Sequence, residues 1–243
     1  MSAGTLYGVG VGPGAPDLLT LRAVAVLRAV PVLAAPRRSE ADASLAGRIA
    51  AEAVGLVPGQ ERLHLTFPMT RDPAVRREAR RVAAAAVGER LGAGRSVAFV
   101  TEGDPMLYSS FLDLLAEAGR HFPTAPIAVV PGVTSLTAVA AAALVPLADG
   151  EGRLAVLPAA GALDELAELS ARFETLVLVK AGAVLPALAA ALERDGLLDR
   201  AVLVSDASTD LERVTRDLKA AARTAAGYFS TVLIRRTPPG EAT

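Results

Sequence analysis

The sequence contains no cysteine and no tryptophan, and only two of its 243 residues are histidine. The absence of cysteine excludes a thiolate nucleophile, an iron–sulfur cluster and a disulfide framework. His64 and His121 are too few and too scattered for a histidine-based metal centre, so we expect no metal site. Chemistry that needs a thiolate or a histidine-bound metal is therefore excluded.

The chain also lacks an excess of charge and long apolar runs. Its net charge is −1, which gives no electrostatic footprint for nucleic acid. Hydrophobic residues make up 52% of the chain, yet no apolar stretch approaches the ~20 residues of a membrane helix. The first residues show no basic segment followed by an apolar run, as a signal peptide would. We therefore expect a cytoplasmic protein with neither a nucleic-acid nor a membrane partner.

Short apolar runs, cut by glycine and proline, alternate with longer helix-like segments. This rhythm predicts an α/β protein with largely parallel strands. A helix is expected from Pro73 to about Leu91, because Asp72 is a good N-cap and glycines follow its end. The expected strands are residues 5–9, 31–35, 62–67, 96–100, 127–130, 154–157, 175–179, 201–204 and 228–235.

The length suits one large domain or two small ones. Helical periodicity breaks and two prolines appear at residues 119–126, so we expect domains at 1–122 and 123–243. The tail 237–243 (TPPGEAT) is expected to lack regular structure.

A glycine-rich loop, residues 8–14 (GVGVGPG), follows the first expected strand. Glycine permits unusual dihedrals and lets a ligand approach the backbone. Gly10, Gly12 and Ala15 loosely match a dinucleotide fingerprint, and Arg37 or Arg38 could hold an NADP phosphate. An NADP-binding oxidoreductase and a purely structural turn both stay open as alternatives.

Two further loops of small and polar residues follow expected strands. In α/β sheets, ligands bind beyond the carboxyl ends of strands, so residues 101–109 (TEGDPMLYS) are a site candidate. Alternatively, Asp104 caps the next helix with Pro105 in its first turn. Residues 131–135 (PGVTS) are explained as well by a helix cap. Lys180 and residues 205–209 also end strands, where they either contact a ligand or mark the strand's exit to water.

These loops together resemble the tetrapyrrole methylase family. The set consists of GVGPG at residues 10–14, TEGDPMLYS at 101–109 and PGVTS at 131–135, and the resemblance covers nearly the whole chain. It implies two α/β domains with an active-site cleft between them, and a homodimer. It also implies that S-adenosyl-L-methionine is bound mostly by backbone groups.

Carried over residue by residue, the resemblance implies these cofactor contacts: Pro13, Glu102, Gly103, Asp104, Leu107, Thr134, Ser135, Lys180 and Ala207. The family usually has GPGDP where this chain has GPGAP, so Ala15 replaces an acid and Asp17 follows two residues later. The resemblance therefore carries no role of that acid over to Ala15.

Within the family, the chain looks most like the enzymes that methylate C-20 of precorrin-2 or of its cobalt-containing counterpart. The pointers are residues 101–111, the segment 67–70 (FPMT) and the segment 154–158 (LAVLP). The substrate would be a tetrapyrrole with several carboxylates, which Arg37, Arg38 and His64 are expected to bind. Asp104, Tyr108 and Glu102 are the expected catalytic residues, because a proton must leave the methylated carbon. His64 is a further candidate for that proton, although its alternating strand favours a half-exposed structural position.

Overall fold

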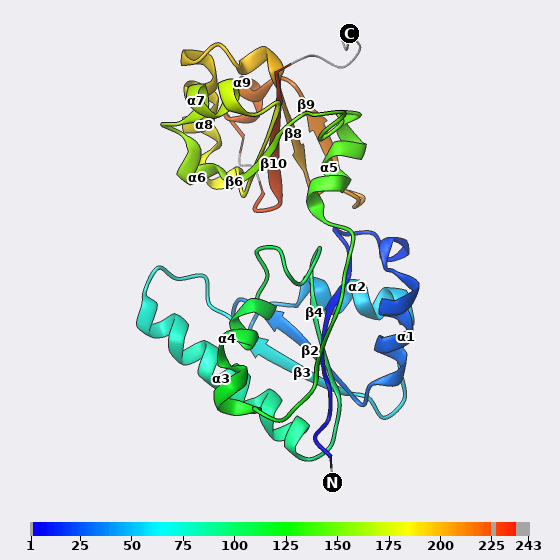
Figure 1. The fold of residues 1–243 in the computed structure, drawn as a ribbon. Helices are drawn as coiled ribbons and strands as arrows, with labels where there is room; N and C mark the ends of the chain where they lie inside the picture. The colour runs from blue at the N-terminus through cyan, green and yellow to red at the C-terminus, as the bar shows by residue number, and fades with distance from the viewer. Residues whose placement is uncertain (1, 225–226, 237–243) are drawn as a thin grey trace. The chain divides into compact units, whose positions relative to one another are not determined.

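The computed structural model describes residues 2–224 and 227–236, so the tail at 237–243 lies outside it. The chain divides into two compact units, Met1–Thr134 and Ser135–Thr243 (Figure 1). Each unit contains a five-stranded sheet with helices on both faces, which confirms the expected α/β class. Among the described residues, no helix combines the length and apolar character needed to cross a membrane.

The sheet of the first unit is entirely parallel and has the strand order β3-β2-β4-β1-β5. Its central strands are buried on both faces, as the Val97–Thr101 segment (VAFVT) shows, which suits a parallel sheet covered by helices. The strands are β1 (Leu6–Gly10), β2 (Val32–Arg37), β3 (Glu61–Thr66), β4 (Val97–Thr101) and β5 (Ile127–Val130).

Three α-helices of this unit begin at polar caps that accept a backbone bond. Thr20, Ser44 and Asp72 each accept a backbone N–H bond at the start of a helix. The expected capping of the long helix by Asp72 is thereby confirmed. The helical segments are η1 (Pro16–Leu18), α1 (Leu21–Ala29), α2 (Leu45–Val54), α3 (Pro73–Gly92) and α4 (Phe111–His121).

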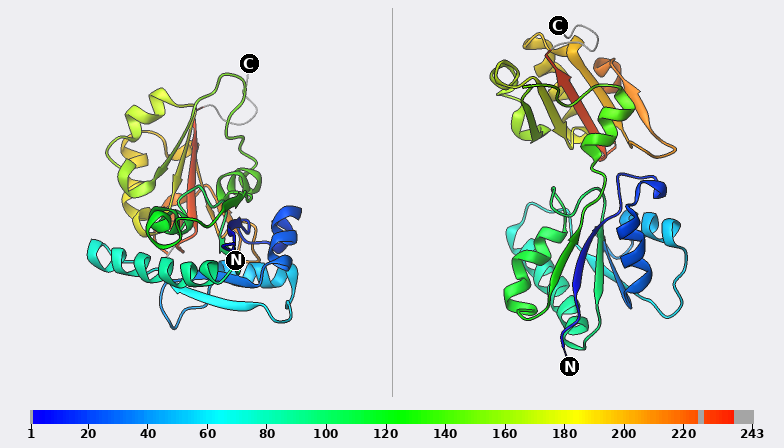
Figure 2. Two further views of the ribbon diagram at one scale, coloured as in Figure 1. Left: turned by 60° about the horizontal axis from the view of Figure 1, so that its bottom comes forward. Right: turned by 45° about the vertical axis from the view of Figure 1, so that its right-hand side comes forward.

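Adjacent strands β1 and β4 send the chain to opposite faces of the first sheet. After β1 the chain enters α1, which packs with α2 against one face through Leu27 and Ile49. After β4 it enters α4, which packs with α3 against the other face through Phe111 and Leu114 (Figures 1 and 2). Such a reversal between neighbouring strands opens a crevice at their carboxyl ends, where α/β sheets bind ligands.

The sheet of the second unit is mixed, with the strand order β6-β7-β10-β8-β9. Its last strand in the chain, β10, lies in the middle and runs antiparallel to both β7 and β8. The strands are β6 (Leu154–Pro158), β7 (Thr175–Val179), β8 (Ala201–Ser205), β9 (Arg213–Thr215) and β10 (Ser230–Arg235).

Helices cover both faces of this second sheet. One core joins Leu166, Leu188 and Leu218, from helices on one side, to the strands. On the other face, Ala138 and Val139 of α5 pack against the strands. The helical segments are α5 (Ser135–Ala143), α6 (Ala159–Ala162), α7 (Leu166–Arg172), η2 (Gly182–Val184), α8 (Leu185–Arg194), η3 (Leu198–Arg200) and α9 (Leu218–Ala221).

This arrangement corrects two expectations and adds one strand, β9, that was not expected. The expectation of largely parallel strands is correct for the first sheet. In the second sheet, only β6 and β7 pair in parallel among the described strands. The short strand β9 has too few residues to show a pattern in the sequence. The boundary at 122/123 also falls too early, because β5 pairs with β1 and therefore belongs to the first unit.

Candidate active site

The three loops singled out in the sequence meet at the carboxyl edge of the first sheet. Gly12 and Gly103 form an isolated antiparallel bridge, in which Gly103 N–H donates to the Gly12 carbonyl at 2.8 Å. Val11 N–H donates to the Thr101 carbonyl at 3.0 Å. Both bridging glycines have a positive φ, 78° and 66°, which other residues adopt only with strain. The loops after β1 and β4 are thus joined backbone to backbone.

The third loop packs against this bridge at Gly132. A Cβ on Gly10 would lie 2.5 Å from the Gly103 carbonyl oxygen and 2.7 Å from Gly132. A Cβ on Gly132 would meet the same Gly103 oxygen at still closer range. The three backbones therefore touch where no side chain can fit, and this contact explains two glycines of the sequence motifs.

Asp104 fastens the second loop to the third. Its Oδ2 accepts an N–H bond of 3.0 Å from Gly132, and its Oδ1 accepts one of 2.8 Å from Met106. The expected alternative, with Asp104 as the cap of the next helix, is wrong, because α4 starts only at Phe111. The Met106 bond instead closes a local turn in which Pro105 is buried.

Glu102 also binds backbone, but on a different element. Its Oε1 accepts an N–H bond of 3.1 Å from Ala46, in the first turn of α2. Glu102 is half-buried and lies at the end of β4, beside the reversal between β1 and β4. Both carboxylates that the sequence marks as catalytic are thus engaged in bonds that hold loops together.

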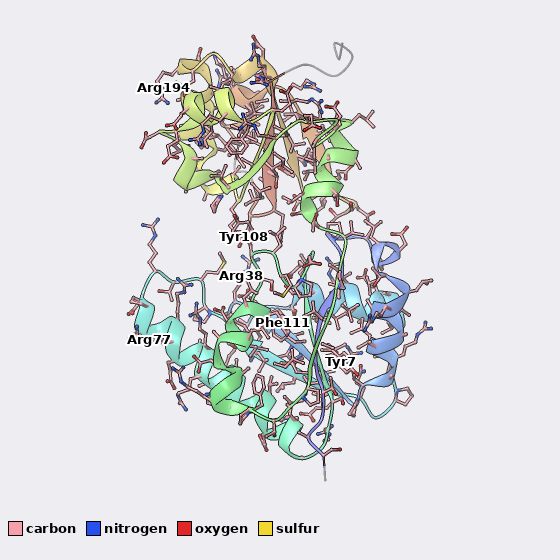
Figure 3. The ribbon with its side chains drawn as sticks, in the orientation of Figure 1. Tyr7, Arg38, Arg77, Tyr108, Phe111 and Arg194 are labelled. Atoms are coloured by element: carbon pink, nitrogen blue, oxygen red, sulfur yellow. The ribbon has the colours of Figure 1, made fainter. Side chains whose placement is uncertain are left out.

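Leu107 and Tyr108 complete the second loop. Leu107 is half-buried, and its N–H donates to the Asp104 carbonyl at 3.2 Å. Tyr108 has a φ of 52° and is 48% exposed, and Figure 3 shows its side chain at the tip of the loop. Ser109 then donates to the Pro105 carbonyl and accepts from Phe111 N–H, which leads the chain into α4.

The glycine-rich loop does not form a nucleotide-type helix start. Only the single turn η1 follows it, and the first α-helix begins at Leu21, behind the cap Thr20. Pro13 is half-buried directly after the bridging Gly12. Ala15, in place of the family's acid, caps η1 without a side-chain bond, and Asp17 is exposed in its first turn. The dinucleotide interpretation therefore loses its structural basis.

Thr134 and Ser135 follow Gly132 at the junction of the two units. Thr134 is the last residue of the first unit, and Ser135 begins α5 of the second. Their position two and three residues beyond the contact with Asp104 agrees with the expectation that PGVTS belongs to the same loop cluster. The segment also leads directly into a helix, since α5 starts at Ser135.

Lys180 and Ala207 lie in the second unit, at the edge where β7 and β8 end. Both chain segments bond to the start of β10: Ala181 N–H donates to the Ser230 carbonyl at 2.8 Å, and Asp206 N–H donates to the Phe229 carbonyl at 2.9 Å. Lys180 is exposed, whereas Ala207 is buried. The two residues predicted from separate strand ends therefore share one edge of the second sheet.

Strained backbone gathers at these same strand ends. Non-glycine residues with positive φ include Tyr108, Lys180, Asp206 and Ser208, at 50° to 62°. Such conformations cost of order 1–3 kcal/mol each and cluster where a loop is held in a required shape. They fall in the loops that sequence reasoning selected, although no sequence signal marks them as strained.

An aromatic pair at the second sheet's edge was missed by sequence reasoning. Tyr228 and Phe229 make an edge-to-face contact with ring centroids 5.1 Å apart, and they are 42% and 39% exposed. The sequence placed both inside a strand that begins at residue 228, but β10 starts two residues later, at Ser230. Their apolar character matched the strand pattern, so nothing in the sequence separated them from it.

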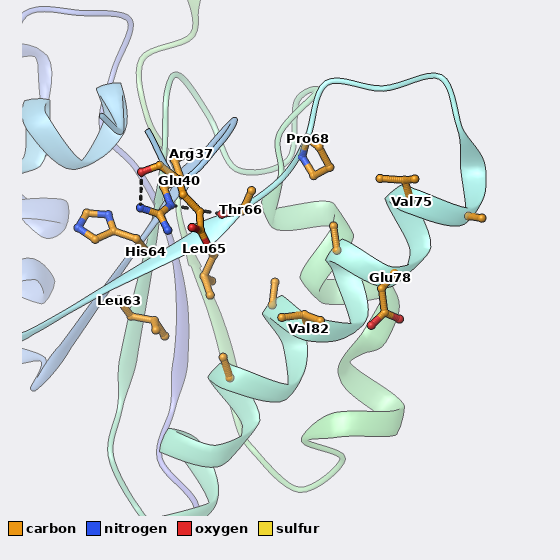
Figure 4. Close-up of a pocket in the computed structure, with 14 residues that line it drawn as sticks. Arg37, Glu40, Leu63, His64, Leu65, Thr66, Pro68, Val75, Glu78 and Val82 are labelled. Carbon is orange, nitrogen blue, oxygen red and sulfur yellow. Dashed lines mark hydrogen bonds between the residues drawn. The ribbon is translucent and has the colours of Figure 1, made fainter. Parts of the chain in front are cut away.

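Arg37 and His64 line two grooves on opposite sides of the sheet edge formed by β2 and β3. The α3 groove, about 680 Å³, runs between β3 and α3 (Figure 4). The α2 groove, about 550 Å³, runs between the same strands and α2. Arg37 Nε donates to Thr66 Oγ1 at 3.3 Å and Nη1 to the Glu40 carbonyl at 3.0 Å, so the guanidinium is held in place.

The other predicted basic residues are more open to solvent. Arg38 is exposed directly after β2 and lies at the edge of the first unit (Figure 3). His64 is exposed on β3, as its alternating pattern suggested. The structure therefore places Arg37, Arg38 and His64 together at the carboxyl half of β2 and β3, and β2 is the neighbour of β4, which leads into the loop cluster.

Comparison with known proteins identifies the class. A family model described as Tetrapyrrole (Corrin/Porphyrin) Methylases matches residues 5–222, and the chain belongs to this family. A cobalt-precorrin-2 C(20)-methyltransferase of Salmonella typhimurium is 35% identical, over 96% of this chain and 97% of that protein. A precorrin-2 C(20)-methyltransferase of a Sinorhizobium species is 36% identical, over 96% of both chains.

Solved structures agree with the fold. A cobalt precorrin-4 methyltransferase superposes with a TM-score of 0.73 at 24% identity, over 95% of this chain and 94% of that one. A uroporphyrin-III C-methyltransferase from Thermus thermophilus, complexed with S-adenosylhomocysteine, gives a TM-score of 0.67 at 26% identity, over 96% and 98%. Membership of this family removes the NADP oxidoreductase alternative.

Proposed function

We propose that this protein transfers a methyl group from S-adenosyl-L-methionine to C-20 of a precorrin-2-type ring. The observation that carries the proposal is the joining of three loops around Gly10, Gly103 and Gly132 at the reversal point of the first sheet. Two relatives that match almost the whole chain are named for C(20) methylation of precorrin-2 or cobalt-precorrin-2. Fold position and relatives thus support one reaction.

The loop cluster suits a ligand that is bound mainly by backbone. S-adenosylmethionine presents amino, carboxylate, ribose and adenine groups, and loops of small residues allow close approach to peptide N–H and C=O groups. We assign its contacts in the first unit to Pro13, Gly103, Asp104, Leu107 and Thr134, and to the backbone of Glu102, whose carboxylate already accepts the Ala46 N–H bond. Ser135, Lys180 and Ala207 of the second unit are assigned by the same resemblance. When bound, the cosubstrate supplies an electrophilic methyl group.

The chain's own task is to position the reactants and manage one proton. Holding a ring carbon in line with the methyl group removes much of the entropic barrier. Asp104 and Glu102 already accept backbone bonds, so we assign both carboxylates to holding the loops. We assign the departing proton to Tyr108, because its side chain is 48% exposed at the tip of the same loop. Its hydroxyl can accept that proton while it passes its own to water.

The basic residues at β2 and β3 are assigned to the carboxylates of the ring. Arg37 is preoriented by Thr66 and Glu40, which lowers the entropy lost when it binds an anion. Arg38 follows β2 directly and His64 lies on β3, and both add donors to this side.

The test supplies isotope-labelled S-adenosylmethionine with precorrin-2 and with cobalt-precorrin-2 in separate reactions. The expected product carries one added methyl group, located at C-20 by carbon NMR, and the rates decide between the metal-free and the cobalt-containing ring. Uroporphyrinogen III serves as the matched control ring and should stay unmodified. Methylation at another ring carbon would overturn the C-20 assignment and keep the family assignment.

We also propose a homodimer in the cytoplasm, as the resemblance implied. Light scattering coupled to size-exclusion chromatography measures the mass, and twice the chain mass of 24.8 kDa is expected. Fractionation of the source cells, with detection by antibody, tests the compartment.

A further inference from the structure

We infer that Glu102 is a positioning residue that holds the amino end of α2 in place for substrate binding. The inference rests on the proposed function, because it concerns the loop that leads from Arg37 and Arg38 into α2. It differs from a catalytic role in that the Glu102 carboxylate acts through the backbone of a distant helix. The contact that carries it is the bond from Ala46 N–H to Glu102 Oε1, 3.1 Å long.

This bond joins elements that are 56 residues apart in the sequence. Ala46 is fully buried and Glu102 is half-buried, so water has little access to replace the carboxylate. Ser44 Oγ accepts a second bond, 3.1 Å, from Gly47 N–H. The first N–H groups of a helix have no partner inside it, and a negative charge there is favourable. The start of α2 therefore has a local cap, Ser44, and a long-range one, Glu102.

The position of the loop between β2 and α2 depends on how its two ends are held. Residues 38–43 are all exposed, so no buried side chain of their own fixes them. They form a small turn in which Asp42 N–H donates to the Ser39 carbonyl at 3.2 Å and Ser39 Oγ donates to Asp42 Oδ2 at 2.8 Å. One end continues from β2, and the other is the start of α2. Loss of the Glu102 bond would loosen that second end.

The loops proposed to bind the cosubstrate are held by hydrogen bonds that do not depend on the Glu102 side chain. The Gly12–Gly103 bridge and the two Asp104 bonds do not involve its side chain. Removal of the Glu102 carboxylate should therefore weaken binding of the tetrapyrrole and spare binding of S-adenosylhomocysteine. A general base would behave differently, because its loss lowers turnover.

The experiment compares Glu102→Ala, Glu102→Gln and Ser44→Ala with the wild-type protein. Glutamine keeps the Oε1 acceptor without the charge, and Ser44→Ala removes only the local cap of the same helix. Hydrogen exchange measures the Ala46 amide and the peptides covering 38–44, and kinetics give KM for each substrate, kcat and its pH profile. Should Glu102→Ala not fold, Glu102→Met, which keeps the side-chain volume, replaces it.

For Glu102→Ala we expect faster hydrogen exchange at the Ala46 amide and in residues 38–44. The KM for the tetrapyrrole should rise about tenfold, while the affinity for S-adenosylhomocysteine should stay within about twofold of the wild-type value. Glu102→Gln should restore slow exchange and nearly normal kinetics. Unchanged exchange in Glu102→Ala, or kinetics equal to those of Ser44→Ala, would overturn the inference. So would a Glu102→Gln protein that loses kcat and one limb of the pH profile. Failure of the wild-type protein to bind S-adenosylhomocysteine would count against the proposed function, while the exchange result still tests the role of Glu102.

Discussion

Asp104 reaches Gly132 across the carboxyl edge of the first sheet, and its Oδ2 accepts the Gly132 N–H bond at 3.0 Å. The same side chain closes its own loop through Met106 N–H at 2.8 Å. One carboxylate therefore fixes two of the three loops relative to each other, and the Gly12–Gly103 bridge fixes the third. The shape of the proposed cosubstrate site depends on these few bonds.

Replacement of Asp104 by alanine should weaken S-adenosylhomocysteine binding by about tenfold or more, because bonds to a charged acceptor are lost at both loops. The affinity of Asp104→Asn should lie between those of the wild type and Asp104→Ala, since asparagine keeps one oxygen that can accept the Met106 N–H bond. Isothermal titration calorimetry measures the affinity. Asp199→Ala, an exposed acid in η3, is the control and should bind normally. Full affinity and turnover in Asp104→Ala would refute the assignment of this loop.

Gly10→Ala should lower the free energy of unfolding by about 3 kcal/mol, the upper part of the usual range for overpacking. The added Cβ would meet the Gly103 carbonyl oxygen at 2.5 Å, and backbone cannot move aside as a flexible side chain can. The urea midpoint gives the change. Gly161→Ala in α6 is the matched control, because its Cβ meets nothing within 4 Å. A Gly10→Ala protein as stable as that control would contradict the close contact of the three loops.

Glu61→Gln should remove part of the acid sensitivity of the first unit. Hydrogen bonds from Arg90 and Arg95 hold the pKa of Glu61 below its ordinary value of 4.5. A carboxylate with a lowered pKa in the folded state stabilises the protein above its unfolded pKa, and this contribution is lost as the pH falls through the folded pKa.

The difference in unfolding free energy between wild type and Glu61→Gln should thus be largest near neutral pH and shrink as the pH falls below 4.5 towards the lowered pKa of the folded state. Urea unfolding across this window measures it. Glu168→Gln, which removes an exposed pair with Arg172, should show little change at any pH. A stability difference that grows as the pH falls would contradict the predicted direction of the pH dependence.

Arg37→Gln should raise the KM for the tetrapyrrole by about tenfold and leave the KM for S-adenosylmethionine within about twofold. The reason is that Arg37, held by Thr66 and Glu40, faces both grooves, whereas the cosubstrate loops lie at β1, β4 and β5. Steady-state kinetics with each substrate varied in turn measure the effect. Arg77→Gln is the control, because Arg77 extends into solvent from α3 (Figure 3). An equal effect in both variants would exclude a specific role for Arg37.

Much of the fold follows from local pattern. Buried parallel strands are short apolar runs, and Asp72-Pro73 marks the start of α3, so both could be read from the sequence. The direction of β10 could not, because an antiparallel strand in the middle of a sheet has the same apolar run as a parallel one. Pairing partners are also not local, which is why β5 was assigned to the wrong side of the boundary.

The sequence predicted which loops form the site, but it did not predict the hydrogen bonds that join those loops. Strand-end position singled out residues 101–109 and 131–135, and the structure brings both to the glycine-rich loop, the first at Gly12 and the second at Gly10. The partners of the carboxylates lie 28 and 56 residues away, at Gly132 and Ala46, and no spacing rule connects them. Asp104 was consequently interpreted as a helix cap or a proton acceptor, and Glu102 as a proton acceptor, before the fold showed which backbone groups they bind.

The central place of β10 in the second sheet has a consequence for how the chain is made. On the ribosome, the five strands of the first unit emerge within the first 130 residues and can pair while synthesis continues. In the second unit, β7 and β8 must wait with open edges until Ser230–Arg235 has been translated. Exposed strand edges invite pairing with other chains. The late stage of synthesis is therefore when this protein most needs protection from aggregation.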